Sequence, residues 1–131
     1  MASSVSVHAS LDVPDIAAGV KFYTEVFGFT EKARPFPAMA ILDAGNVTLC
    51  IHEKAVGTSP APGSAATRDY ARHWTPVHLD FHVPALDPVL ERIVQGGGRI
   101  ETEYRTIGPR PTAFCSDPFG HGFCVIASAE R

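Results

Sequence analysis

The sequence predicts an α+β fold made of two tandem βαβββ modules, and three observations support this prediction. The motif His-x-x-apolar-x-Val-Pro occurs twice, beginning at His8 and again at His78. Apolar and polar residues alternate through each copy, which is typical of a strand with one buried face. An apolar helical stripe that ends in glycine follows each copy, at Gly28 and at Gly96. A motif repeated in this way indicates that one structural unit is used twice.

The first module begins with an alternating strand over residues 5–13. Pro14 and Asp15 end this strand and start a helix, because proline and aspartate are favoured at helix N-termini. The helix closes at Gly28. Three further strands are predicted over residues 29–36, 38–43 and 46–53, with a hairpin turn at Ala44-Gly45-Asn46.

A loop-forming connector rich in glycine, proline and serine separates this module from the second, and we expect a short helix in it near residues 65–73. The second module repeats the first as a strand, a helix ended by three glycines, and three strands, over residues 77–83, 87–95, 99–107, 112–117 and 122–128. We therefore predict a single domain over residues 1–131, with module one at 4–53, the connector at 54–75 and module two at 76–129.

Composition and charge exclude several classes of protein. The chain has 131 residues, 45% of them hydrophobic and 19% charged, as expected for a globular domain. The formal net charge of −3 and the scattered basic residues argue against nucleic-acid binding, and no apolar run is long enough to span a membrane. Three cysteines and an N-terminus without a signal-peptide pattern predict a cytoplasmic protein with reduced thiols.

Two further motifs point to a known family. The first helix ends in Phe-Tyr-Thr-Glu-Val-Phe-Gly-Phe over residues 22–29, and the second module contains Asp117-Pro118-Phe119-Gly120. In this order, and together with the repeated histidine motif, they resemble the vicinal oxygen chelate superfamily, the glyoxalase/bleomycin resistance protein/dioxygenase family. The resemblance implies that the two modules form a cup-like, partly open β-sheet barrel with the helices outside. It also implies a divalent metal ion (zinc, iron, manganese or nickel), a small-molecule ligand or substrate, and a homodimer.

The predicted metal ligands are His8, His78, Cys50 and Cys124. The histidines lie at the family's histidine positions, on the polar face of their strands. The cysteines lie where the family typically has glutamate, so two interpretations remain. The four residues form a Cys2His2 set suited to tetrahedral zinc, or the cysteines are inert core residues and the metal site is degenerate, which the usual burial of free cysteine favours.

Other side chains are expected to line the pocket. His52 shares a face with Cys50, and Asp80 and His82 share a face with His78. A set of His8, His78 and His52 would resemble an open catalytic site, and Asp80 would orient a histidine beside it. The predicted pocket residues are His52, Asp80, His82, Tyr104, Arg110 and Phe114, and Arg34, Phe36, Trp74 and Arg105 are candidates for the wall.

Two functions fit this sequence. The first is a metal-dependent lyase, isomerase or dioxygenase that acts on a small molecule with adjacent oxygens, as the resemblance implies. The second is a metal-free protein that binds a drug or toxin, which the absence of both glutamates favours. Because one fold supports many functions, the sequence does not name the substrate.

Overall fold

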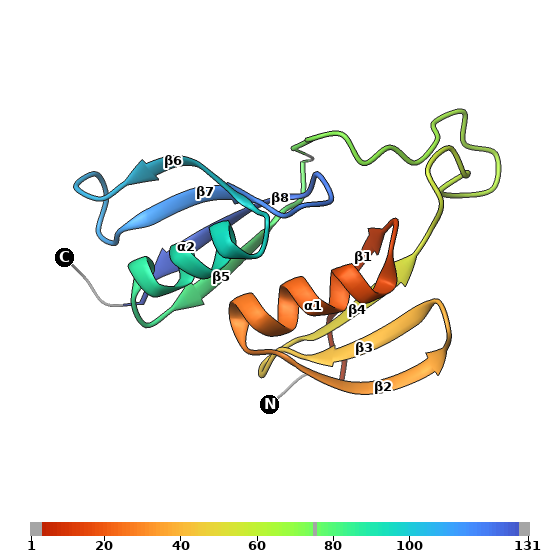
Figure 1. Cartoon of the computed structure of the whole chain (residues 1–131), viewed down its shortest axis with the longest axis horizontal. Helices are drawn as coiled ribbons and strands as arrows, with labels where there is room; N and C mark the ends of the chain where they lie inside the picture. The colour runs from red at the N-terminus through yellow and green to blue at the C-terminus, as the bar shows by residue number, and fades with distance from the viewer. Residues whose placement is uncertain (1–3, 75, 129–131) are drawn as a thin grey trace. The chain divides into compact units, whose positions relative to one another are not determined.

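The computed structural model describes residues 4–74 and 76–128 and divides into two compact units, Met1–Asp69 and Tyr70–Arg131. The first unit contains β1 (His8–Val13), α1 (Ile16–Phe27), β2 (Thr30–Phe36), β3 (Met39–Asp43) and β4 (Thr48–Glu53). The second contains β5 (Leu79–Val83), α2 (Leu86–Gln95), β6 (Arg99–Tyr104), β7 (Thr112–Ser116) and β8 (Gly122–Ala127). Each unit is therefore a βαβββ module, as predicted (Figure 1).

Each module forms one open four-stranded sheet with the same topology. The strand order is β1-β4-β3-β2 in the first sheet and β5-β8-β7-β6 in the second. The first strand of each module runs parallel to the last, and the other neighbours are antiparallel. A helix packs on one face of each sheet, and we call the opposite face the open face. The α+β prediction is thus confirmed, and neither sheet closes into a barrel.

Helix α1 is fixed at both ends by side chains and glycine. The Asp15 side chain accepts a hydrogen bond from the Ala18 amide (3.2 Å), and Gly28 ends the helix with a positive φ of 74°. Glu53, at the end of β4, accepts a hydrogen bond from the Ile16 amide with its Oε1 atom (3.0 Å). This carboxylate satisfies a free amide at the positive end of the helix and ties the helix to the sheet.

The core of each module lies between its helix and its sheet. Gly19 lets α1 approach the sheet closely, because a Cβ atom there would lie 2.9 Å from Val13 Cγ2 and 3.0 Å from Ile51 Cγ2. In the second module Phe81 and Phe123 pack edge to face, with ring centroids 5.4 Å apart. The buried apolar residues of this core include Val83, Leu86, Val89, Leu90, Ile93, Ala113, Cys115, Phe123, Val125 and Ala127.

The predicted connector helix near residues 65–73 is wrong, since these residues contain no helix. The segment is tied down in other ways. The Arg68 carbonyl accepts a hydrogen bond from the Gly57 amide, and the Arg68 amide donates to the Thr58 carbonyl (2.8 Å each). The Arg68 guanidinium also pairs with Asp12 (2.7 Å). These bonds to distant residues replace the local bonds that a helix would need.

The two units divide between Asp69 and Tyr70, inside the predicted connector. Thr75 and Ala129, at the predicted ends of the connector and of module two, lie outside the described residues. Within residues 4–74 and 76–128, neither helix has the length and apolar character needed to cross a bilayer.

The close packing at Gly19 predicts that a larger side chain destabilises the first module. We expect Gly19→Leu to lower the free energy of unfolding by about 1–3 kcal/mol, because the new side chain has no space against Val13 and Ile51. Ala17→Leu is the matched control on the exposed side of the same helix and should change it by less than about 0.5 kcal/mol. Urea denaturation measures both, and equal effects would contradict the packing argument.

The hydrogen bond from the Ile16 amide to Glu53 predicts that a side chain of β4 stabilises α1 by capping its N-terminus. Glu53→Ala should lower the free energy of unfolding by about 1 kcal/mol, the usual effect of losing a side-chain cap. Glu53→Gln retains an oxygen acceptor and should lose less. If urea denaturation gives the same loss for both variants, the carboxamide does not replace the carboxylate as a cap.

Candidate functional site

The polar candidate residues lie on the open faces of the two sheets. In the first sheet His8 pairs with Thr48, Ser10 with Cys50 and Asp12 with His52. In the second sheet Asp80 pairs with Cys124 and His82 with Ile126. Since facing residues of paired strands share a face and alternate residues return to it, each sheet presents one polar row opposite its helix-covered face.

Three of these side chains gather in the second sheet. One nitrogen of His78, one oxygen of Asp80 and the sulfur of Cys124 all lie within 4.8 Å of one another. The His78 Nε2 atom is 3.2 Å from Asp80 Oδ1. His78 and Asp80 are 37% and 46% exposed in their side chains, whereas Cys124 is buried. We call these three residues the His–Asp–Cys cluster, and within residues 4–74 and 76–128 it is the one such grouping of three His, Cys, Asp or Glu side chains.

Burial and charge hold Cys124 in its neutral form. Burial raises the pKa of its thiol to about 11, and the Asp80 carboxylate contributes through its negative charge and by accepting a hydrogen bond. Cys115 lies one strand away on the helix-covered face, where burial raises its pKa to about 12. Both thiols therefore keep their protons near neutral pH, and Cys124 is the one that belongs to the His–Asp–Cys cluster.

Residues 4–69, the described part of the first unit, contain no counterpart of this cluster. Ser10 stands where the second module has Asp80, so Cys50 pairs with a hydroxyl residue in place of a carboxylate. Asp12, the nearest acid on the same row, is ion-paired to Arg68. His8 and Cys50 thus share the open face of one sheet, and His78 and Cys124 share the open face of the other.

An aromatic row borders the cluster. The indole of Trp74 meets the His78 ring edge to face, with centroids 5.2 Å apart, and lies 5.7 Å from the Phe114 ring. Phe114 in turn meets Tyr104 at 5.5 Å. Trp74, Phe114 and Tyr104 are 42%, 38% and 38% exposed, although they contact one another. We call these three residues the aromatic row, and exposed aromatic surface beside polar groups is typical of a ligand site.

The remaining predicted pocket residues occupy separate places. His82 is exposed and lies two residues beyond Asp80 on β5, and His52 is half-buried opposite Asp12. Arg110 lies in the loop between β6 and β7. Two of the wall candidates are held in ion pairs. Arg34 pairs with Glu31, and Arg105 pairs with both Asp87 and Glu103.

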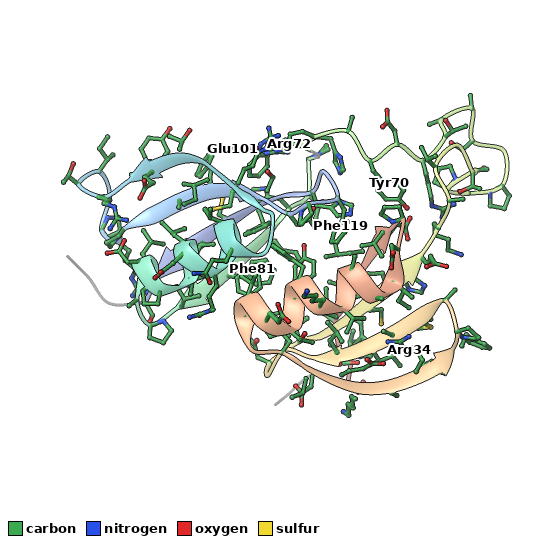
Figure 2. The ribbon with its side chains drawn as sticks, viewed as in Figure 1. Arg34, Tyr70, Arg72, Phe81, Glu101 and Phe119 are labelled. Atoms are coloured by element: carbon green, nitrogen blue, oxygen red, sulfur yellow. The ribbon has the colours of Figure 1, made fainter. Side chains whose placement is uncertain are left out.

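Sequence reasoning missed two residues that position Trp74. Arg72 and Glu101 form a two-bonded ion pair, and Figure 2 shows their side chains together at one end of the second sheet. The Trp74 Nε1 atom donates a hydrogen bond to Glu101 Oε1 (3.3 Å). The Arg72 guanidinium lowers the pKa of the Glu101 carboxyl, chiefly through its hydrogen bonds. The sequence did contain a signal for this contact. Gly120 and Gly122 have no side chain, so another segment of the chain can approach the backbone closely there.

The His–Asp–Cys cluster offers one nitrogen, one oxygen and one sulfur donor. This mixture fits zinc, which accepts all three ligand types and is held by three protein ligands in catalytic sites. It fits manganese less well, since manganese prefers oxygen donors. The donor chemistry and the short separations therefore fit a zinc-type ion.

The fold and this polar face place the chain in a known class. The sequence pattern of the glyoxalase-like domain family matches residues 8–126, so the chain belongs to that family and to the vicinal oxygen chelate superfamily. The resemblance inferred from the motifs is thereby confirmed.

Solved structures show the same fold at low sequence identity. Fosfomycin resistance protein FosX from Listeria monocytogenes is 22% identical, with a TM-score of 0.71 over 98% of this chain and 96% of its own. FosX from Mesorhizobium loti is 14% identical, with a TM-score of 0.71 over 98% and 95%. Lactoylglutathione lyase from Agrobacterium tumefaciens is 16% identical, with a TM-score of 0.66 over 97% and 96%. No curated protein matches the chain in sequence.

The raised pKa of Cys124 predicts a slow and pH-dependent reaction with iodoacetamide. Alkylation of Cys124 should accelerate from pH 7 towards its pKa of about 11, because the thiolate is the nucleophile. Asp80→Asn removes the negative charge that disfavours the thiolate, so it should lower the pKa and raise the rate several-fold near pH 8. Peptide mass spectrometry assigns the modified cysteine.

Asp87→Asn is the matched control, since Asp87 is an exposed carboxylate at the start of α2. It should leave the rate at Cys124 unchanged. A rate at Cys124 that does not depend on pH between 7 and 10, or an equal response to both variants, would contradict the assigned cause.

Proposed function

We propose that this glyoxalase-like protein binds a small molecule on the open face of its second sheet, and that His78, Asp80 and Cys124 hold a zinc-type ion there. The observation that supports this is the convergence of three different donor atoms within 4.8 Å. FosX from Listeria monocytogenes, which has a similar fold, has been crystallised as a mutant with Mn(II) and 1S,2S-dihydroxypropylphosphonic acid. The cysteine and the histidine of the present cluster favour zinc over manganese.

The reaction class we propose is a lyase, isomerase or dioxygenase step on a substrate with neighbouring oxygen atoms. A bound ion would polarise such an oxygen. The protein's own groups would bind and orient the substrate. The His78 Nε2 and Asp80 Oδ1 atoms lie 3.2 Å apart, and the edge-to-face contact with Trp74 would hold the His78 ring in place. Positioning of this kind is a substantial part of catalysis.

Several expectations remain part of this proposal. The expectation that His8 and Cys50 are metal ligands stays a prediction from the sequence. We propose that the two modules act as one domain, that the protein is a homodimer, and that it is cytoplasmic. His52, His82 and Arg110 remain proposed pocket residues beside Tyr104 and Phe114.

A metal titration tests the proposed function. Isothermal titration of the metal-free protein should show one zinc per chain, bound at least about tenfold more tightly than manganese. Cys124→Ser and Asp80→Asn should each weaken zinc binding by at least about tenfold, because each removes or weakens one of three donors. Binding should also weaken at lower pH, since the cysteine and histidine ligands must lose their protons.

The controls use the same residue types outside the cluster. Cys115→Ala alters a buried cysteine on the helix-covered face, and Asp87→Asn alters an exposed carboxylate. Both variants should bind zinc as the parent protein does. Tighter binding of manganese than of zinc, or unchanged zinc binding in Cys124→Ser, would refute the assignment.

A metal-free binding protein is the second candidate, and the neutral Cys124 thiol favours it. On this alternative the cluster is only the polar end of a pocket, with Asp80 paired to His78. Thermal shifts with a panel of drug-like ligands, measured with and without EDTA, separate the two functions. Equal shifts in both conditions support metal-free binding, and shifts abolished by EDTA support the metal-dependent function.

A further inference from the structure

Residues 70–74 fold back against the turn that connects β7 to β8, and we call this segment the strap. The His73 amide donates a hydrogen bond to the Gly120 carbonyl (2.9 Å), and His73 forms a parallel bridge with His121. A Cβ atom on Gly120 would lie 2.5 Å from the carbonyl oxygens of Tyr70 and Ala71. The strap therefore depends on glycine at this position for its close approach.

Gly122 likewise leaves space for side chains of the strap. A Cβ atom there would lie 2.7 Å from Arg72 Nη2 and 2.7 Å from Trp74 Cε2. Gly122 is the first residue of β8, and Cys124 follows two residues later on the same face. The indole of Trp74 thus lies directly over the strand that carries the cysteine of the cluster.

The two histidines fix the strap through a defined tautomer. His73 Nδ1 lies 2.9 Å from the Ala71 carbonyl, which only accepts, so Nδ1 carries the hydrogen. In the neutral ring the Nε2 atom of His73 is then an acceptor. It lies 3.2 Å from His121 Nδ1, which therefore donates to it. This bond joins the strap to the β7–β8 turn.

Charged groups fix the indole itself. The Arg72 guanidinium stacks on Trp74, with Cζ 4.6 Å from the ring centroid, and both side chains bind Glu101. A cation over an indole face and a hydrogen bond to its N–H remove most of the freedom of the ring. Trp74 is nevertheless 42% exposed. It is therefore a rigid aromatic surface that remains accessible in this structure.

We infer, on the basis of the proposed function, that Trp74 determines specificity and selects ligands with a flat aromatic ring. The ring would lie along the aromatic row, formed by Trp74, Phe114 and Tyr104. A chelating group on the ring would reach the His–Asp–Cys cluster, because Trp74 contacts His78 directly. Aromatic surfaces favour planar rings over saturated rings of equal size, since ring pairs gain specific stacking or edge-to-face contacts.

Two hydroxamic acids test this inference, because they carry the same pair of chelating oxygens. Benzohydroxamic acid has a planar ring and cyclohexanecarbohydroxamic acid has a saturated one. With the zinc-loaded protein, calorimetry should give about tenfold tighter binding of the aromatic compound, which is the upper range for aromatic pair interactions. Trp74 is the only tryptophan of the chain, so benzohydroxamic acid should also quench the protein's tryptophan fluorescence.

Variants separate specificity from structure. Trp74→Leu should bring the ratio of the two affinities close to one while both compounds still bind, and Trp74→Phe should restore part of it. Glu101→Gln weakens the support of the indole without removing it and should lower the ratio. Glu103→Gln, on the same strand but paired with Arg105, should leave the ratio unchanged.

The outcomes distinguish the inference from the function on which it rests. Equal binding of both hydroxamic acids to the parent protein refutes the role of Trp74 and leaves the proposed metal site intact. An unchanged ratio in Trp74→Leu refutes it as well. If neither compound binds, the proposed function fails and the specificity inference fails with it.

Discussion

The parallel register between β5 and β8 is the constraint on which the candidate site depends. It sets Asp80 opposite Cys124 and brings the cysteine sulfur to the carboxylate and to His78. A shift of one residue would turn Phe123 or Val125 to the open face and bury the cysteine under α2. The apolar neighbours hold the register, because Phe123, Val125 and Ala127 are buried on the helix-covered face. Packing of the core therefore determines the chemistry of the opposite face.

The two modules share a topology, but the register between the first and last strands places different residues opposite each other. The same pairing in the first module sets Ser10 against Cys50, and a hydroxyl neither repels a thiolate nor supplies a strong metal donor. Glu53, the one carboxylate at the end of β4, turns towards the helix side and caps α1. In this module the acidic groups serve stability, whereas in the second module Asp80 serves the open face. One repeated unit has thus been used in two physically different ways.

Much of this arrangement was predictable from sequence, because strand parity and glycine-ended helices are local patterns. The alternation around His78 placed Asp80 on the same face as the histidine, and the structure pairs Asp80 with Cys124. The strap was not predictable in the same way. Arg72 and Glu101 are 29 residues apart, and neither lies in a sequence motif that predicts the ion pair between them. The connector helix was wrong for a related reason, since Arg68 gains hydrogen bonds and an ion pair from residues that local propensity ignores.

The Asp80 carboxylate would act on Cys124 in opposite ways with and without the ion that we propose the cluster holds. Without a cation, its charge opposes formation of the thiolate and adds to burial in raising the pKa to about 11. A divalent cation held there would reverse the sign of the local field, because its charge would exceed that of the carboxylate and would stabilise a thiolate ligand. Asp80 would then act as a ligand in place of a source of repulsion. The same residue thus keeps the thiol unreactive, and with the ion that we propose it would favour binding once the proton has left.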